Sequence, residues 1–165
     1  MQNAKDSFYL ALRDRLAALD PSRTVTVNGI ARPAILVVEN EVTMADIPPS
    51  GVLCLGWLGA QAVAGFEHAT QPLMELACQF DYWTEGTQPN AYQDRGRMLA
   101  ALDAALLQIC APPRTPLMDH TISPAAALGG SVTWTRPVLQ PLTLDGRRLR
   151  RTAAMKVFAM AEFTC

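Results

Sequence analysis

The sequence predicts an α+β domain: a mainly antiparallel, mixed sheet with two amphipathic helices packed on one face, plus projecting hairpins and a long loop. Three observations lead to this. Apolar residues alternate with polar ones over residues 74–82, two other segments repeat leucines at helical spacing, and Asn28-Gly29 and Asp145-Gly146 are typical hairpin turns. The chain has 165 residues, half of them hydrophobic, so we expect one domain over residues 1–165.

The N-terminal segment indicates a helix at about Ala4–Leu19. Asn3 is a suitable N-cap, and Asp20-Pro21 ends the segment. The apolar residues that share one side of this helix are Phe8, Leu12, Leu16 and Leu19.

The next 50 residues read as strands and turns. A β-rich run at residues 24–27, the Asn28-Gly29 turn and a strand over residues 30–39 predict a hairpin. Residues 40–50 indicate an exposed loop, and residues 52–58 a short apolar strand. The small residues of the 59–71 segment fit either a loop or a turn of helix.

The centre of the chain predicts a strand that leads into a helix. On the strand, one side carries Leu76, Cys78, Phe80 and Tyr82, and the other carries Glu75, Gln79 and Asp81. Asn90 and Gln93 read as an N-cap and a weak capping box, which starts a helix at about Ala91–Cys110 before Pro112-Pro113 ends it. Its apolar side consists of Leu99, Leu102, Leu106 and Ile109.

The last third of the chain predicts a long connection and a hairpin. Residues 111–130 hold four prolines and Gly129-Gly130, which indicates about twenty residues of extended loop, a length that is usually functional or ordered by a partner. Ser131–Leu139 and Arg148–Phe163 then read as two strands of a terminal hairpin. The residues that share one side of the second strand are Ala153, Met155, Val157, Ala159, Ala161 and Phe163.

Composition argues against several classes of function. A net charge of −1 provides no general attraction to nucleic acid or to an anionic membrane, and no apolar run is long enough to span a bilayer. The N-terminus lacks the order of a signal peptide, so we expect folding in a cytoplasm. The cysteines form no C-x-x-C pair, and His68 and His120 have no ligand at helical spacing. We therefore expect reduced thiols, no metal, no cofactor and no catalytic site; the cysteines are Cys54, Cys78, Cys110 and Cys165.

Charged residues supply the only candidate site. Arginines flank the last turn and the start of the central helix, where cations oppose the helix dipole. Either they form a solvated surface or they meet carboxylates across an interface. Arg95 also falls on the apolar side of its helix and needs a partner or a route to solvent. The candidate interface residues are Arg95, Arg97, Arg147, Arg148, Arg150 and Arg151, with Glu39, Glu41 and Glu85 as acidic counterparts. We expect that changing Arg148 and Arg151 together to Glu leaves the monomer folded.

Four segments carry a resemblance to a known family: Phe80–Gly86, Arg95–Ile109, Trp134–Pro137 and Arg151–Val157. With the order of elements, they resemble the tail-terminator or tail-completion proteins of tailed bacteriophages, of the minor tail protein U type. The resemblance implies a subunit without catalytic residues that forms a homohexameric ring, caps the tail tube and joins it to the head or neck.

The same resemblance implies the partners and the location. They are further copies of the chain, the tail tube protein and head–tail connector or neck proteins, within the virion after assembly in the bacterial host cytoplasm. DNA would pass through the lumen without sequence-specific contacts, and no membrane is involved. Two other hypotheses stay open: another phage or contractile-injection connector, such as a neck or baseplate subunit, and a small ligand-binding domain. The last would need the Ala111–Gly130 loop to close over a pocket that contains His120.

Overall fold

The computed structural model describes residues 1–42 and 47–162 of the chain. Its elements, in chain order, are α1 (Gln2–Leu19), β1 (Thr24–Val27), β2 (Ile30–Pro33), β3 (Ile35–Val37), α2 (Val38–Glu41), β4 (Leu53–Ala62), β5 (Leu73–Thr84), η1 (Gln88–Asn90), α3 (Arg95–Ile109), β6 (Arg114–Asp119), β7 (Ala126–Trp134), β8 (Val138–Leu139), β9 (Thr143–Asp145) and β10 (Arg148–Met160). This is the α+β class that the sequence predicts.

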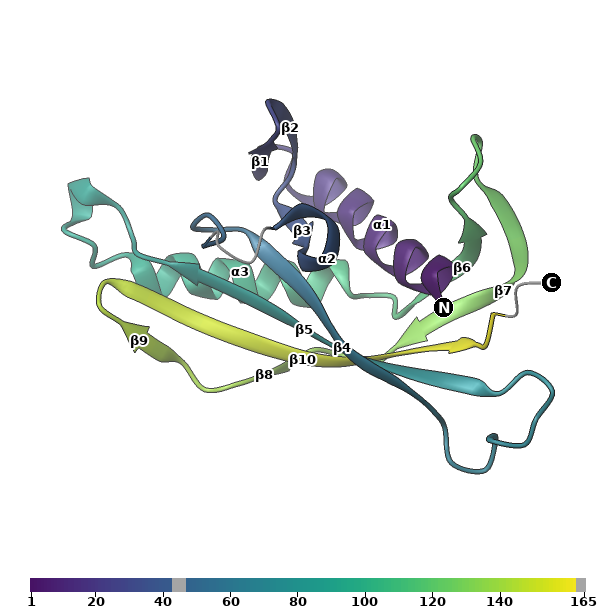
Figure 1. Cartoon of the computed structure of the whole chain (residues 1–165). Helices are drawn as coiled ribbons and strands as arrows, with labels where there is room; N and C mark the ends of the chain where they lie inside the picture. The colour runs from purple at the N-terminus through teal and green to yellow at the C-terminus, as the bar shows by residue number, and fades with distance from the viewer. Residues whose placement is uncertain (43–46, 163–165) are drawn as a thin grey trace.

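The described strands form one large sheet and one small hairpin (Figure 1). The large sheet has the order β3-β4-β5-β10-β7-β6, and β8 and β9 pair with β10. Among the described strands, only β3 and β4 pair in parallel, so the sheet is mixed and mainly antiparallel. β1 and β2 form the separate hairpin around Asn28-Gly29, whose two residues have positive φ angles as a two-residue turn requires. Helices α1 and α3 lie on one face of the large sheet (Figure 1).

β5 and β10 are the spine of the sheet, because they pair from Leu149 opposite Thr84 to Met160 opposite Leu73. The alternation predicted for both strands is confirmed. The buried side chains that point to the helices are Leu76, Cys78, Phe80 and Tyr82 on β5, and Ala153, Met155, Val157 and Ala159 on β10. Phe163, assigned to the same side from the sequence, lies outside the described residues.

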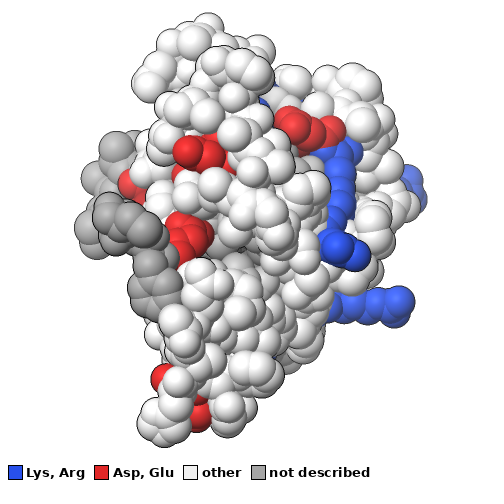
Figure 2. Space-filling view, turned by 90° about the vertical axis from the view of Figure 1, so that its right-hand side faces the viewer, with Lys and Arg blue, Asp and Glu red and all other residues white. Residues whose placement is uncertain are grey.

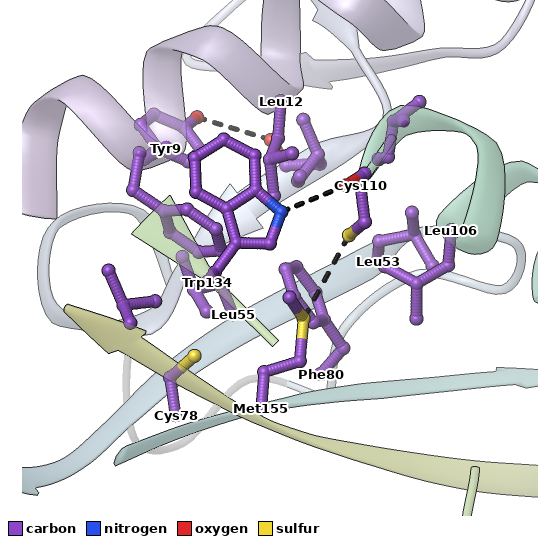
Figure 3. Packing of buried hydrophobic residues seen from close by; sticks show 14 of the residues in the cluster. Tyr9, Leu12, Leu53, Leu55, Cys78, Phe80, Leu106, Cys110, Trp134 and Met155 are labelled. Atoms are coloured by element: carbon purple, nitrogen blue, oxygen red, sulfur yellow. Dashed lines mark hydrogen bonds between the residues drawn. The ribbon is translucent and has the colours of Figure 1, made fainter. Parts of the chain in front are cut away.

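The core between sheet and helices is closed by Trp134 (Figure 3). Its ring meets that of Phe8 edge to face, with 5.0 Å between centroids, and its Nε1 donates to the Cys110 carbonyl at 2.9 Å. The leucines predicted for α3 line this core, as do Phe8, Leu12 and Leu16 of α1, whereas Leu19 is 44% exposed. An indole with its N–H satisfied buries a large apolar surface without an unpaired donor.

Both predicted helix starts are wrong, and the reason is tertiary structure. Asn3 makes no cap; the carboxylate of Glu162, at the other end of the chain, accepts hydrogen bonds from the backbone N–H groups of Asn3 and Ala4 at 3.2 and 2.8 Å. A carboxylate at a helix N-terminus satisfies free donors and complements the dipole. The helix in the centre begins at Arg95 rather than Ala91, because Ala91 and Tyr92 adopt left-handed backbone angles.

The predicted long loop over residues 111–130 is also wrong. Most of it forms the β6–β7 hairpin, which continues the sheet. Prolines suggested a loop, but Pro116 is accommodated on β6, an edge strand, where one missing N–H costs no ladder bond. β4 likewise runs past residue 58 to Ala62, with an irregularity between Trp57 and Gly59.

Two of the predicted strands are interrupted in the structure. The strand expected over residues 30–39 is divided into β2, β3 and the short helix α2, and that expected over 131–139 into β7 and β8. The terminal turn at Asp145-Gly146 is confirmed. Among the described residues, no helix has the length and apolarity to cross a membrane.

Candidate functional site: an arginine-rich end

The start of α3 and the β9–β10 turn meet at one end of the molecule, on the left in Figure 1. Arg95 Nη1 donates to the Arg147 carbonyl at 3.2 Å, which joins the two elements although they lie far apart in the sequence. Arg97 is exposed on the first turn of α3, and Arg147 and Arg148 stand on the β9–β10 turn. We call Arg95, Arg97, Arg147 and Arg148 the arginine end. The structure therefore brings four of the six predicted arginines together.

Aromatic rings hold two of these arginines in place. The guanidinium of Arg147 lies 4.7 Å from the centroid of Tyr92, and that of Arg148 lies 4.8 Å from the centroid of Trp83. Trp83 is fixed in turn, since its Nε1 donates to the Pro48 carbonyl at 2.8 Å. Cation–π stacking restrains a guanidinium while leaving its N–H edge free to donate.

Gly86 makes the close approach of the Tyr92 segment to β5 possible. A Cβ at this position would lie 2.7 Å from Asp94 Oδ1 and 2.9 Å from the Tyr92 carbonyl oxygen, and its φ of 81° suits glycine. Asp94 closes the turn by accepting from the N–H and the hydroxyl of Thr87 at 2.8 and 2.6 Å. These hydrogen bonds lower the pKa of Asp94 to about 2. A rigid turn therefore carries Tyr92 beneath Arg147.

In the described part of the chain, the arginine end has no carboxylate within ion-pair distance. Nearby in sequence are Glu85, Asp94 and Asp145, of which Asp94 is engaged by Thr87. The local excess of positive charge is thus small. What distinguishes the site is a set of restrained, planar donors suited to bidentate hydrogen bonds with carboxylates.

Arg150 and Arg151 have partners within the chain. Arg150 Nη2 lies 3.2 Å from Asp81 Oδ1. Arg151 is 18% exposed; it donates to both oxygens of Asp103 at 3.2 and 2.9 Å and to the Gln140 carbonyl at 2.8 Å. The premise that Arg148 and Arg151 are both exposed charges is therefore wrong for Arg151, and we now expect reversal of its charge to destabilise the fold, because the part-buried carboxylate of Asp103 would lose its counterion.

Two of the three acidic candidates are also occupied, and they lie on α2 rather than at the arginine end. Glu39 forms an ion pair with Lys5 at 3.0 Å. Glu41, 12% exposed, pairs with Arg32 and accepts from the Tyr9 hydroxyl and the Val37 N–H. Burial raises the pKa of Tyr9, and the charge of Arg32 opposes that shift. Glu39 and Glu41 are therefore not candidates for contact with the arginine end of a neighbouring copy. Glu85, half-buried at the end of β5, remains beside it.

His120 does line a cavity, together with Lys5, Tyr9 and Trp57, and its Nε2 is buried with no hydrogen-bond partner in the described structure. The cavity measures about 160 Å³. Pockets for small organic ligands usually measure about 300–1,000 Å³. His68 lies in the exposed β4–β5 turn, and the described residues contain no cluster of three or more His, Cys, Asp or Glu that could hold a metal.

The three cysteines within the described ranges are free and buried, and burial raises the pKa of each thiol to about 12; they are Cys54, Cys78 and Cys110. Cys165 lies outside the described residues.

Comparison with protein-family models finds no match for this chain, and comparison with curated proteins finds none either. The site thus has to be interpreted from its own geometry. Sequence reasoning found its arginines through their clustering but missed Tyr92 and Trp83, the residues that restrain them. Trp83 carried one usable signal, since it lies on the polar side of the alternating strand.

Proposed function

We propose that this protein is a structural subunit of a bacteriophage tail, which forms a ring that caps the tail tube and joins it to the head or neck. The motif resemblance described above suggests the family, and an α+β subunit fits it. The observation that carries the proposal is the arginine end. Its partners in this role are other copies of the chain, the tail tube protein and connector or neck proteins.

The restraint of the arginines is what favours a protein contact. Ordering a free arginine side chain at an interface costs about 0.5–1.5 kcal/mol. Stacking on Trp83 and Tyr92, together with the bond from Arg95 to the β9–β10 turn, meets part of that cost before any partner arrives. Arginine and aromatic residues are also the types that contribute most to protein interfaces. The arginine end therefore suits an acidic surface on a neighbouring subunit or on the tail tube.

A different connector of the same machine, such as a neck or baseplate subunit, would use the same surface, because fold and charge do not distinguish ring proteins. The partner that binds the arginine end separates these functions. The test is co-sedimentation of the purified protein with tail tubes, with neck protein or with baseplate protein.

The decisive variant carries both Arg147→Glu and Arg148→Glu. Neither arginine has an ion pair within the described ranges. We expect it to stay folded and to lose binding to tail tubes. Arg136→Glu is the matched control: Arg136 is also exposed, but it follows β7 and lies near the Lys156 half of β10. Equal binding by the two variants, or a wild-type protein that ignores tail tubes, would refute the proposal.

A further inference from the structure

Most edges of the large sheet are protected against pairing with another chain. On β6, the hydroxyl of Ser7 accepts from the Met118 N–H at 2.9 Å and donates to the Met118 carbonyl at 3.3 Å, while Arg15 donates to the Arg114 carbonyl at 2.8 Å. Helix α1 thereby takes the place of a neighbouring strand. The β8–β9 edge contains Pro137 and Pro141, which cannot donate to a ladder.

The far half of β4 has no such protection. β3 pairs only with Leu53–Leu55, so in the described structure Gly59–Ala62 of β4 pairs with β5 on one side and with no strand on the other, and Leu58 lies at the irregularity just before this segment. The segment Leu58–Ala62 contains no charge and no proline, and Leu58 is 62% exposed. Such a strand edge is a template for another strand.

β7 has a second open edge. It pairs with β6 at Ser131–Thr133 and at Ala126–Ala127, with a register shift between the two parts where Gly129 has a φ of 76°, and among the described residues it reaches β10 only at Thr133 and Trp134. Over Ala126–Gly130 the opposite edge is therefore free among the described residues, every residue is exposed, and none is charged. Figure 1 shows the β6–β7 hairpin standing away from the body of the sheet, and Figure 2, which faces that end, shows a surface made mostly of uncharged residues.

We propose that the β7 edge at Ala126–Gly130 of one copy pairs with the β4 edge at Leu58–Ala62 of a second copy, so that the sheet continues from subunit to subunit. The occupant is a second copy because one chain supplies both edges, each open on one side in the described structure and each without a charged residue. The two edges differ, so the contact is head to tail, and a closed ring leaves neither exposed. This rests on the proposed function for its ring, and it leaves the arginine end free for the tail tube.

The test uses two variants that each block one edge. Ala60→Lys places a charge on the β4 edge and Ala127→Lys on the β7 edge; both alanines are exposed, and lysine is the residue that natural edge strands use against pairing. Ala64→Lys, in the exposed turn after β4, is the control. We expect each edge variant to be monomeric by sedimentation and the control to assemble like the wild type.

Mixing the two edge variants tests the direction of the contact. One keeps the β7 edge and the other keeps the β4 edge, so a 1:1 mixture makes one contact and stops at a dimer. Amide exchange in the wild-type assembly should slow at residues 58–62 and 126–130 relative to the edge-variant monomers. Circular dichroism establishes that both variants are folded.

Three results would overturn this inference while leaving the ring itself standing: wild-type-like assembly by either edge variant, a mixture that stays monomeric while the wild type assembles, or protection of residues 58–62 only when tail tube protein is added. A wild-type protein that stays monomeric under all conditions would overturn both the inference and the proposed function.

Discussion

Removal of the Arg151 guanidinium should destabilise the fold, because this side chain is the counterion of a part-buried carboxylate. Asp103 of α3 accepts from Arg151 of β10 at 3.2 and 2.9 Å and from the Tyr82 hydroxyl of β5 at 2.6 Å. The carboxylate thus ties a helix to two strands. Burial, followed by the neighbouring carboxylate, raises the pKa of Tyr82, so its hydroxyl stays a donor.

The expected size follows from burial. Breaking a fully buried pair by deleting one partner costs about 3–5 kcal/mol, and exposed pairs contribute about 0–1 kcal/mol. Arg151 and Asp103 are 18% and 13% exposed, which places the cost of Arg151→Ala between these two ranges, at about 2–3 kcal/mol. For a chain of this size that corresponds to a melting temperature lower by about 4–12 °C.

The assay is urea unfolding followed by tryptophan fluorescence, with Arg97→Ala as the control. Arg97 is exposed and has no ion pair in the described structure, so its change should stay within about 0.5 kcal/mol. A double-mutant cycle of Arg151→Ala with Asp103→Ala should give a coupling energy of about 0.5–3 kcal/mol. If Arg151→Ala is as stable as Arg97→Ala, the contact between Arg151 and Asp103 contributes nothing to stability, and our interpretation of Arg151 is refuted.

Three further predictions concern the core, the helix start and the thiols. Leu106→Ala, at a fully buried site, should cost about 2–5 kcal/mol of unfolding free energy, and Leu107→Ala, 43% exposed on the same helix, much less; equal losses would contradict the assignment of the core. The pKa of Asp94 is lowered, so its carboxylate stabilises the fold above the ordinary pKa of 3.8, and this stabilisation is lost as pH falls toward 2. In acid titrations, the stability difference between wild type and Asp94→Asn should therefore shrink over that pH range. A constant difference would contradict the stabilising role of Asp94. The thiols of Cys54, Cys78 and Cys110 are buried and have raised pKa values, so the stability of the fold should decrease as pH rises from 9 toward 12. A thiol reagent at pH 8 should modify these residues only after unfolding, and rapid reaction in the native state would show that they are accessible.

Hydrophobic periodicity in the sequence correctly predicted the central strand and the central helix. The alternation on β5 and the leucine side of α3 follow from the repeat of strand and helix, and both are confirmed. The start of α1 could not be read in this way, because its cap is Glu162, about 160 positions away along the chain. Ala91 and Tyr92 hold left-handed angles that glycine, asparagine or aspartate would normally signal.

The β6–β7 hairpin was missed because proline and glycine density outweighed a weak alternation, in which Leu117 is the buried member of β6. The candidate arginines were found by their clustering, but a cluster in the sequence does not distinguish a free guanidinium from a bound one. Arg148 and Arg151 are three residues apart, but only Arg151 has partners on other elements in the described structure that give it a structural role: Asp103 of α3 and the Gln140 carbonyl.

The central claim, that this chain acts as a ring subunit, is tested most directly by the mass of the wild-type assembly in solution, alone and with tail tube protein. Native mass spectrometry over a concentration series resolves multiples of the 17.9 kDa subunit. We predict a single closed species, a hexamer, that forms alone or on the tube and does not grow further as concentration rises. A strict monomer at high concentration, unchanged by tail tubes, would contradict the account.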